Sequence, residues 1–96
     1  MLTSENIDKE VNQEGLILVK FISDSCKECQ KMDLVLNKIT YPIYTVDIDK
    51  EPNLMEDYDV EIIPTILLFL NGQLIEKIVG FKTKTTLMSI INAIIN

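Results

Sequence analysis

The sequence predicts an α/β domain in which a mixed sheet of four strands has helices on both of its faces. Helical and strand-like patterns alternate along the chain in the order α-β-α-β-α-β-β-α. Two almost continuous apolar runs, at residues 16–22 and 66–70, are typical of strands buried on both faces. Asn71-Gly72, between the last two strand patterns, is the strongest short signal for an antiparallel hairpin.

The first predicted helix covers about residues 4–13. Ser4 is a favourable N-cap residue, because its hydroxyl can accept a free backbone N–H of the first turn. The apolar residues that would face the core, Ile7 and Val11, are four positions apart and therefore share one helical face. Gly15 lies just beyond the expected end, where glycine commonly closes a helix.

The strand at residues 16–22 contains one charged residue, Lys20, whose place in a buried strand needs an explanation. A polar loop at residues 23–25 then leads into a second predicted helix over Cys26–Lys38, which ends before Tyr41-Pro42. Its apolar residues are expected to face the core, Leu34 more weakly than the others: Met32, Leu34, Val35, Leu36 and Ile39. Its charged residues are expected to face solvent: Lys27, Glu28, Lys31 and Asp33.

The second half of the chain continues this alternation. The predicted elements are a strand Ile43–Ile48, a helix Asp49–Tyr58 with Pro52 near its start, strands Ile66–Leu70 and Gln73–Val79, and a final helix. Thr83 or Thr85 is expected to cap that helix, whose buried face would hold Leu87, Ile90, Ile91, Ile94 and Ile95. Carboxylates are crowded in residues 47–61, and we expect them to form a solvated face rather than a docking patch for a basic partner. They are Asp47, Asp49, Glu51, Glu56, Asp57, Asp59 and Glu61.

The two cysteines, Cys26 and Cys29, stand at the start of the second predicted helix. Two thiols separated by two residues can close a disulfide within one helical turn. The free N–H groups and the positive dipole end of a helix also favour thiolate over thiol. The chain has no histidine, which excludes catalysis by a histidine base and leaves thiol chemistry. A strand, a loop and a CxxC pair opening a helix together indicate a redox site.

Composition limits the other possibilities. Ninety-six residues make a single domain, residues 1–96, and a net charge of −6 argues against nucleic acid as a partner. The longest apolar stretch, Ile62–Leu70, is too short to span a bilayer, so no membrane association is expected. The polar and acidic N-terminus lacks a secretory signal, which favours the cytoplasm. A small acidic domain of this kind is expected to be a monomer.

The chain resembles the thioredoxin family over nearly its whole length. The features that carry the resemblance are, in order, LILVKF, Cys26-Lys27-Glu28-Cys29, Val46-Asp47-Ile48-Asp49, Ile63-Pro64-Thr65, the hairpin Phe69–Gln73 and Gly80. The CxxC pair followed by Ile-Pro-Thr about 35 residues later is the most specific combination. The resemblance implies a thioredoxin-like fold and a redox-active dithiol that reduces disulfides in protein substrates.

The resemblance also implies the roles of individual residues. Cys26 would attack a substrate disulfide as the nucleophile, and Cys29 would resolve the mixed disulfide. Ile63–Pro64 would be a cis peptide bond beside the disulfide, whereas the residues alone also allow an ordinary trans proline that ends a helix before a strand. Ser25, Ile63 and Pro64 would then contact an extended substrate segment. A flavoprotein thioredoxin reductase would supply electrons, and the domain itself would bind no cofactor and no metal.

The sequence departs from the family pattern at several positions around the thiols. Ser25 stands where the family usually has tryptophan, and Lys27-Glu28 replaces Gly-Pro. Lys27 should favour the thiolate of Cys26, whereas Glu28 should oppose it and could take over some proton transfer. Lys20 stands where the family usually buries an aspartate. It would either lie beneath Cys29 as a buried cation, or extend to solvent or pair with an acid.

Three other interpretations remain open at this stage. A structural zinc site wants four ligands, so two cysteines would need a second chain or carboxylates. A redox-inert interaction module could retain the fold without the chemistry. A glutathione-linked glutaredoxin would usually have a Gly-Gly-Asp-type turn where this chain has Val79-Gly80-Phe81-Lys82-Thr83.

Overall fold

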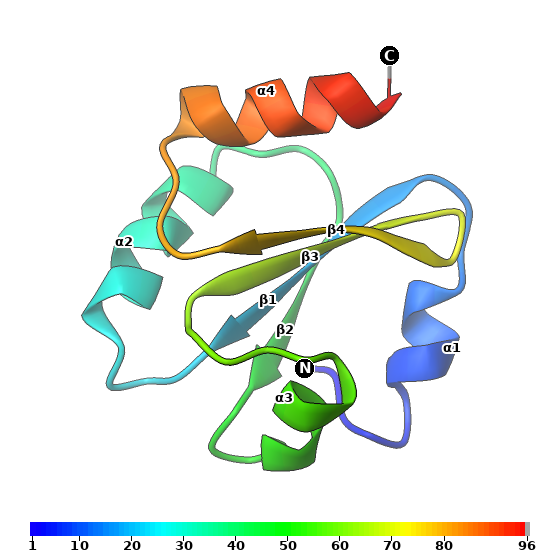
Figure 1. Ribbon diagram of the computed structural model, residues 1–96, viewed down its shortest axis with the longest axis vertical. Helices are drawn as coiled ribbons and strands as arrows, with labels where there is room; N and C mark the ends of the chain where they lie inside the picture. Colours follow the sequence, from blue (N-terminus) through cyan, green and yellow to red (C-terminus); the bar gives the residue numbers. More distant parts are fainter. Residues whose placement is uncertain (96) are drawn as a thin grey trace.

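The computed structural model, which describes residues 1–95, contains one four-stranded sheet with the strand order β2-β1-β3-β4 (Figure 1). The central strand β1 (Leu16–Ile22) pairs in parallel with β2 (Ile43–Asp47). On its other side it pairs antiparallel with β3 (Thr65–Leu70), which turns at Asn71-Gly72 into antiparallel β4 (Gln73–Val79). The mixed sheet and the predicted hairpin are therefore confirmed.

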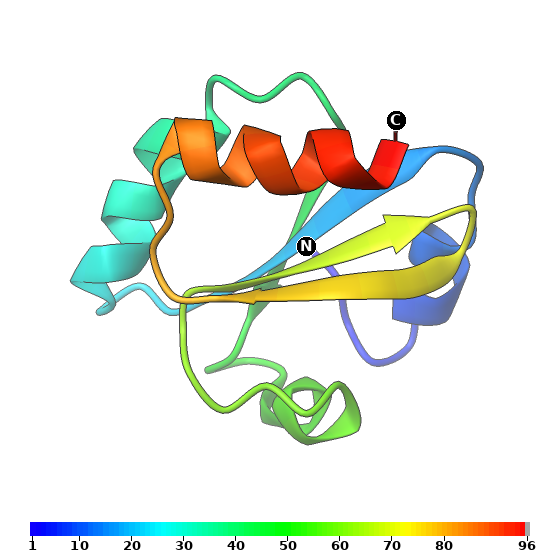
Figure 2. The same cartoon turned by 45° about the horizontal axis from the view of Figure 1, so that its top comes forward.

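The helices lie on both faces of the sheet, two on each face. Figures 1 and 2 show α2 (Lys27–Leu36) and α4 (Lys84–Ile95) on one face, and α1 (Ile7–Val11) and α3 (Pro52–Asp57) on the other. Alternate residues of β1 supply the two cores. Ile17, Val19 and Phe21 pack toward α1 and α3, while Leu16 and Leu18 pack toward α2 and α4. This alternation places Lys20 on the α2 side of the sheet.

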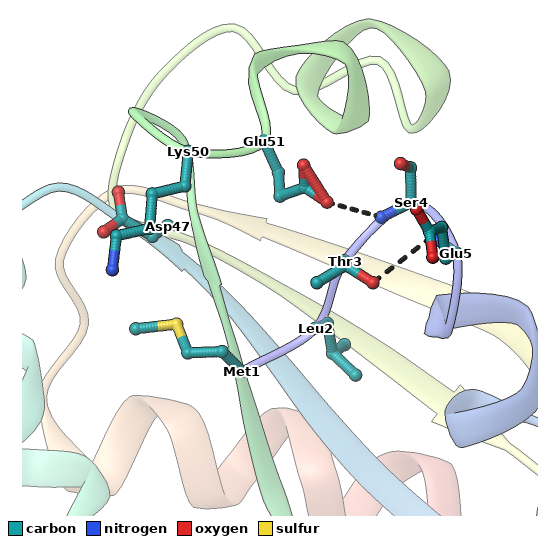
Figure 3. Close-up of a pocket in the computed structure, with 8 residues that line it drawn as sticks. All are labelled: Met1, Leu2, Thr3, Ser4, Glu5, Asp47, Lys50 and Glu51. Carbon is teal, nitrogen blue, oxygen red and sulfur yellow. Dashed lines mark hydrogen bonds between the residues drawn. The ribbon is translucent and has the colours of Figure 1, made fainter.

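The first helix is shorter than predicted, and Ser4 does not cap it. Residues 4–6 form turns, and α1 begins only at Ile7. The N-cap residue is Asn6, whose side chain makes no capping hydrogen bond, and the Asn6 N–H donates to the hydroxyl of Thr3 at 3.2 Å. The N–H of Ser4 instead donates to Glu51 Oε1 at 2.6 Å, which ties the N-terminal segment to the turn before α3 (Figure 3).

Other boundaries differ from the prediction by a few residues for local reasons. α3 begins at Pro52 rather than Asp49, because the residues before it form a turn. In this turn the backbone oxygen of Asp47 accepts the N–H groups of Lys50 and Glu51. Within the predicted solvated acidic face, Asp47 is only 4% exposed, and its carboxylate accepts the Asp49 N–H at 3.0 Å. Thr83, rather than Thr85, caps α4 by accepting the Thr86 N–H at 3.2 Å.

Two apolar side chains assigned to the core lie outside it. Leu34 is 67% exposed, because it lies on the side of α2 that faces away from the sheet. Ile95, at the end of α4, is also exposed. Among the helices of residues 1–95, none combines the length and apolar character that crossing a bilayer requires.

Tyr58 links the aromatic residues of the core beside α3. Its ring packs edge-on against Phe21, with ring centroids 6.4 Å apart, and against Phe69 at 6.2 Å. Burial raises the pKa of the Tyr58 phenol above its ordinary value, and the carboxylates of Asp8 and Asp57 raise it further. The protonated phenol is therefore the form that the folded state favours.

Tyr58 is expected to make the free energy of unfolding fall in alkaline solution. A pKa that is raised by folding leaves stability unchanged below the unfolded-state value of about 10. Stability is then lost as the pH rises through the folded-state pKa. Urea unfolding of the wild type and of Tyr58→Phe at pH 7, 9 and 11 measures this. The free energy of unfolding of the wild type minus that of Tyr58→Phe should be the same at pH 7 and pH 9. It should be lower at pH 11, because only the wild type has the phenol. A constant difference at all three values contradicts the assignment.

Candidate active site

The two cysteines form a disulfide at the start of α2, with their Cα atoms 5.2 Å apart. Cys26 is the N-cap residue: its backbone is extended, with φ −87° and ψ 108°, and the helix begins at the next residue. This geometry arises because β1 ends at Ile22 and the polar loop of residues 23–25 reverses the chain toward α2. The pair therefore lies at the carboxyl end of the central strand, as the sequence predicted.

The two sulfur-bearing residues differ in exposure. Cys26 is partly exposed, whereas Cys29, one turn further along α2, is only 2% exposed and lies in the core. A large disulfide substrate can therefore approach Cys26 but not Cys29.

The start of the helix provides electrostatic stabilisation at Cys26 Sγ. This sulfur accepts the backbone N–H of Cys29 at 3.1 Å, one of the free donors of the first turn. In the reduced protein the same N–H and the helix dipole favour a thiolate at this position over a neutral thiol. This stabilisation does not require a histidine base.

The loop before Cys26 is fixed by hydrogen bonds from another segment. Ser23, which is 7% exposed, donates its hydroxyl proton to Asp49 Oδ2 at 2.7 Å. Its oxygen lies 3.2 Å from the exposed hydroxyl of Ser25, and its backbone oxygen accepts the Cys26 N–H at 3.1 Å. Sequence reasoning selected Ser25 but missed Ser23 and Asp49. Because β1 and β2 are parallel, the segments that follow them emerge at the same edge of the sheet, a signal that could have found the pair.

The Ile63–Pro64 peptide bond is cis, as the resemblance implies, and Pro64 is buried while Ile63 is partly exposed. Both residues directly precede β3, whose first residue, Thr65, pairs with Phe21 near the end of β1. This register brings the proline turn to the edge of the sheet from which the Cys26 loop emerges.

A series of contacts connects the proline turn to the active-site helix. The oxygen of Pro64 accepts the Gly80 N–H at 2.8 Å. The two residues after Gly80 both contact α2. The Lys31 ammonium lies over the ring of Phe81, 5.1 Å from the ring centroid. The Lys82 N–H donates to the sulfur of Met32 at 3.4 Å. The structure therefore assembles the thiols, the proline turn and the segment after β4 into one site.

A shallow pocket of about 250 Å³ lies against the proline turn. Exposed apolar side chains of Ile62 and Val79 form part of its lining, and the other residues that line it are Asp59, Glu61, Thr65 and Lys77. Neither cysteine lines this pocket, and four of its six lining residues are polar or charged. A second hollow, of about 320 Å³, lies between the N-terminal segment and the turn after β2 (Figure 3) and includes neither cysteine.

Lys20 forms an ion pair with Asp33. Its Nζ lies 2.7 Å from Asp33 Oδ1, and the two side chains are 20% and 43% exposed. Of the two predicted arrangements, pairing with an acid is therefore the one observed. Asp33, which was expected to face solvent, is partly exposed and also contacts Lys20 on the sheet. It follows Cys29 by four residues, so the two side chains share one face of α2, and this spacing could have indicated its orientation toward the sheet.

The two residues between the cysteines, Lys27 and Glu28, are exposed. Glu28 Oε1 lies 3.4 Å from the Nζ of Lys31, a surface pair that contributes little to stability. In residues 1–95, no group of three or more histidine, cysteine, aspartate or glutamate side chains is placed to hold a metal ion.

The fold and the site together define a class of protein: a thiol–disulfide oxidoreductase whose redox centre is the Cys26–Cys29 pair. The thioredoxin family model matches residues 1–93, and the chain belongs to the thioredoxin family. The family predicted from the sequence, the fold and the enzyme class are thereby confirmed, and the redox-inert interpretation is not supported.

Individual relatives agree with this assignment. Thioredoxin from Chlamydia trachomatis serovar D is 33% identical over 97 residues, covering 96% of this chain and 94% of that protein. Thioredoxin from Staphylococcus aureus strain Mu50 is 30% identical, covering 95% and 92%. A mutant thioredoxin from Halobacterium salinarum NRC-1 has a similar solved structure, with a TM-score of 0.85 and 24% identity, covering 97% of this chain and 86% of that one. The solved structure supports the fold.

Proposed function

We propose that this protein reduces disulfide bonds in protein substrates in the cytoplasm, with Cys26 as the nucleophile and Cys29 as the resolving thiol. The unequal exposure of the two cysteines is the observation that most supports these roles. The attacking sulfur has to meet a bulky partner, whereas the resolving sulfur only has to reach its neighbour one helical turn away.

The reaction is a pair of thiol–disulfide exchanges. The Cys26 thiolate attacks one sulfur of the substrate disulfide, the bond between the two substrate sulfurs breaks, and the departing thiolate takes up a proton. The Cys29 thiol loses its proton and attacks Cys26 Sγ. This step releases the second substrate thiol and closes the Cys26–Cys29 disulfide. Two electrons pass from the dithiol to the substrate.

The surrounding residues have supporting roles in this proposal. Ser25, Ile63 and Pro64 contact the substrate segment that flanks the disulfide, and the backbone of Ile63 pairs with it. The ammonium of Lys27 favours the Cys26 thiolate, whereas the carboxylate of Glu28 opposes it. The close Lys31 ammonium offsets part of that opposition.

Members of the family reduce disulfide substrates and receive electrons from thioredoxin reductase. We propose that a flavoprotein thioredoxin reductase returns two electrons to the Cys26–Cys29 disulfide here. The domain would act as a monomer, without a bound cofactor, nucleic acid or membrane.

A redox titration tests the proposed direction of the reaction. The purified protein is equilibrated in a series of oxidised and reduced dithiothreitol buffers, and free thiols are labelled and counted by mass. We expect a single two-electron transition with a midpoint below about −230 mV, on the reducing side of the glutaredoxin range. The Cys26→Ser variant is the matched control and should show no such transition. A midpoint above about −180 mV would indicate disulfide formation or isomerisation, and the absence of any transition would contradict the oxidoreductase assignment.

A further inference from the structure

A chain of three hydrogen-bonded side chains ends immediately before the nucleophile. It starts at the Asp49 carboxylate, which accepts the Ser23 hydroxyl at 2.7 Å, and continues to the Ser25 hydroxyl, 3.2 Å from Ser23 Oγ. Ser25 is exposed and is bonded directly to Cys26. The proposed mechanism does not use the direction of these hydrogen bonds.

The chemistry of the three groups fixes that direction. A serine hydroxyl has one proton, and an ionised carboxylate can only accept. Ser23 gives its proton to Asp49, so its oxygen has to act as the acceptor in the contact with Ser25. Ser25 therefore donates its own proton inward. The Ser25 oxygen can then still accept a hydrogen bond from a bound molecule through a lone pair.

The middle residue of this chain, Ser23, and its carboxylate end, Asp49, are both held in place by further hydrogen bonds. Ser23 is buried, and its backbone oxygen accepts the Cys26 N–H at 3.1 Å. Asp49 is positioned from the other side, because its N–H donates to the buried carboxylate of Asp47 at 3.0 Å. Successive hydrogen bonds that end on a carboxylate polarise one another and make the last oxygen a better acceptor.

We propose that Ser25 Oγ is an acceptor subsite for a backbone N–H of the substrate, close to the cysteine that Cys26 attacks. This inference rests on the proposed function. The substrate sulfur has to reach Cys26, whose Cα is about 3.8 Å from that of Ser25. An extended segment presents N–H groups at every second residue on each side, so an amide next to the attacked cysteine comes within reach. A substrate group that can only accept a hydrogen bond would find no donor at Ser25.

Backbone N-methylation of the substrate tests this inference. A short peptide disulfide is compared with two versions, one methylated on the amide nitrogen of the attacked cysteine and one on that of the following residue. Second-order rate constants for their reduction are measured with the wild type and with Ser25→Ala. For each protein, the rate constant for the unmodified peptide is divided by that for the methylated peptide. This ratio cancels general effects of the substitution on the thiols.

For one of the two methylated peptides, we expect the ratio to be about fivefold larger in the wild type than in Ser25→Ala, which is the rate equivalent of one hydrogen bond. Ser25→Thr, which keeps a hydroxyl, should restore the wild-type ratio. Ser89→Ala, which removes an exposed hydroxyl on α4, is the matched control and should keep the wild-type ratio. Equal ratios in the wild type and Ser25→Ala for both peptides would overturn the inference.

A second substrate separates this outcome from a failure of the proposed function. The aromatic disulfide 5,5′-dithiobis(2-nitrobenzoate) has no N–H group, so its reduction by the wild type depends on the thiols and not on an amide at Ser25. If the wild type reduces neither this compound nor the peptide, the disulfide-reductase assignment is wrong. If it reduces both and the ratios are equal, only the Ser25 subsite is wrong.

Discussion

The Cys29→Ser variant is expected to accumulate as mixed disulfides with its substrates. Cys26 remains partly exposed and keeps the start of α2 beneath it, so it can still attack. Without Cys29 no internal thiol is available to displace the substrate from Cys26 Sγ. The reduced variant is incubated with oxidised insulin, the reaction is quenched with acid, and adducts are identified by non-reducing electrophoresis and intact mass.

The Cys26→Ser variant is the matched control and is expected to lose disulfide reduction down to the assay background. Its remaining thiol is only 2% exposed and cannot meet a protein disulfide. It should form no adduct under the same conditions. If Cys26→Ser traps substrate and Cys29→Ser does not, the two roles are reversed, and the difference in exposure does not determine the order of attack.

Removing one partner of the Lys20–Asp33 pair at a time is expected to shift the reactivity of Cys29 in opposite directions. Lys20→Met leaves the carboxylate alone on the face of α2 that Cys29 shares, so the Cys29 thiolate is disfavoured and resolution slows. Asp33→Asn leaves the ammonium alone and speeds resolution. Because both side chains are partly exposed, solvent screens their charges, and we expect changes of about threefold to tenfold.

The rate of resolution can be measured directly by forming the mixed disulfide of Cys26 with a chromogenic thiol and following release of that thiol at neutral pH. The double variant Lys20→Met with Asp33→Asn has neither charge and should return toward the wild-type rate, which makes a double-mutant cycle possible. Glu14→Gln, which removes an exposed carboxylate before the start of β1, at the opposite end of that strand from the cysteines, separates a local effect from a change in net charge. Shifts in the same direction for both single variants would indicate that the pair acts only by supporting the structure.

Much of the fold was predictable because its signals are local. β1 matches the predicted strand at residues 16–22, and the Asn71-Gly72 turn fixes β3 and β4 as antiparallel neighbours. The helix boundaries were less predictable, because tertiary contacts determine them. Ser4 has a good capping side chain, but its backbone N–H donates to Glu51, 47 residues away in the sequence, and α1 begins only at Ile7.

The candidate site was predictable in part for the same reason. The CxxC pair and the Ile63–Pro64 turn are local motifs, and their spacing identified them. Asp33 and Asp49 act through contacts that depend on how α2 and the turn after β2 pack against β1. One-dimensional patterns classify such carboxylates as solvated, since most of them are. Strand order and helix orientation bring these two carboxylates into contact with Lys20 and Ser23.

The burial of Cys29 beside a more accessible Cys26 also bears on damage by peroxide. A peroxide that reaches Cys26 oxidises its sulfur to a sulfenic acid, which further oxidation converts irreversibly to sulfinic acid. The thiol of Cys29 lies within one helical turn and can condense with the sulfenic acid, releasing water and restoring the Cys26–Cys29 disulfide. The same pairing that completes an exchange thus returns an oxidised sulfur to a form that a reductase can recycle.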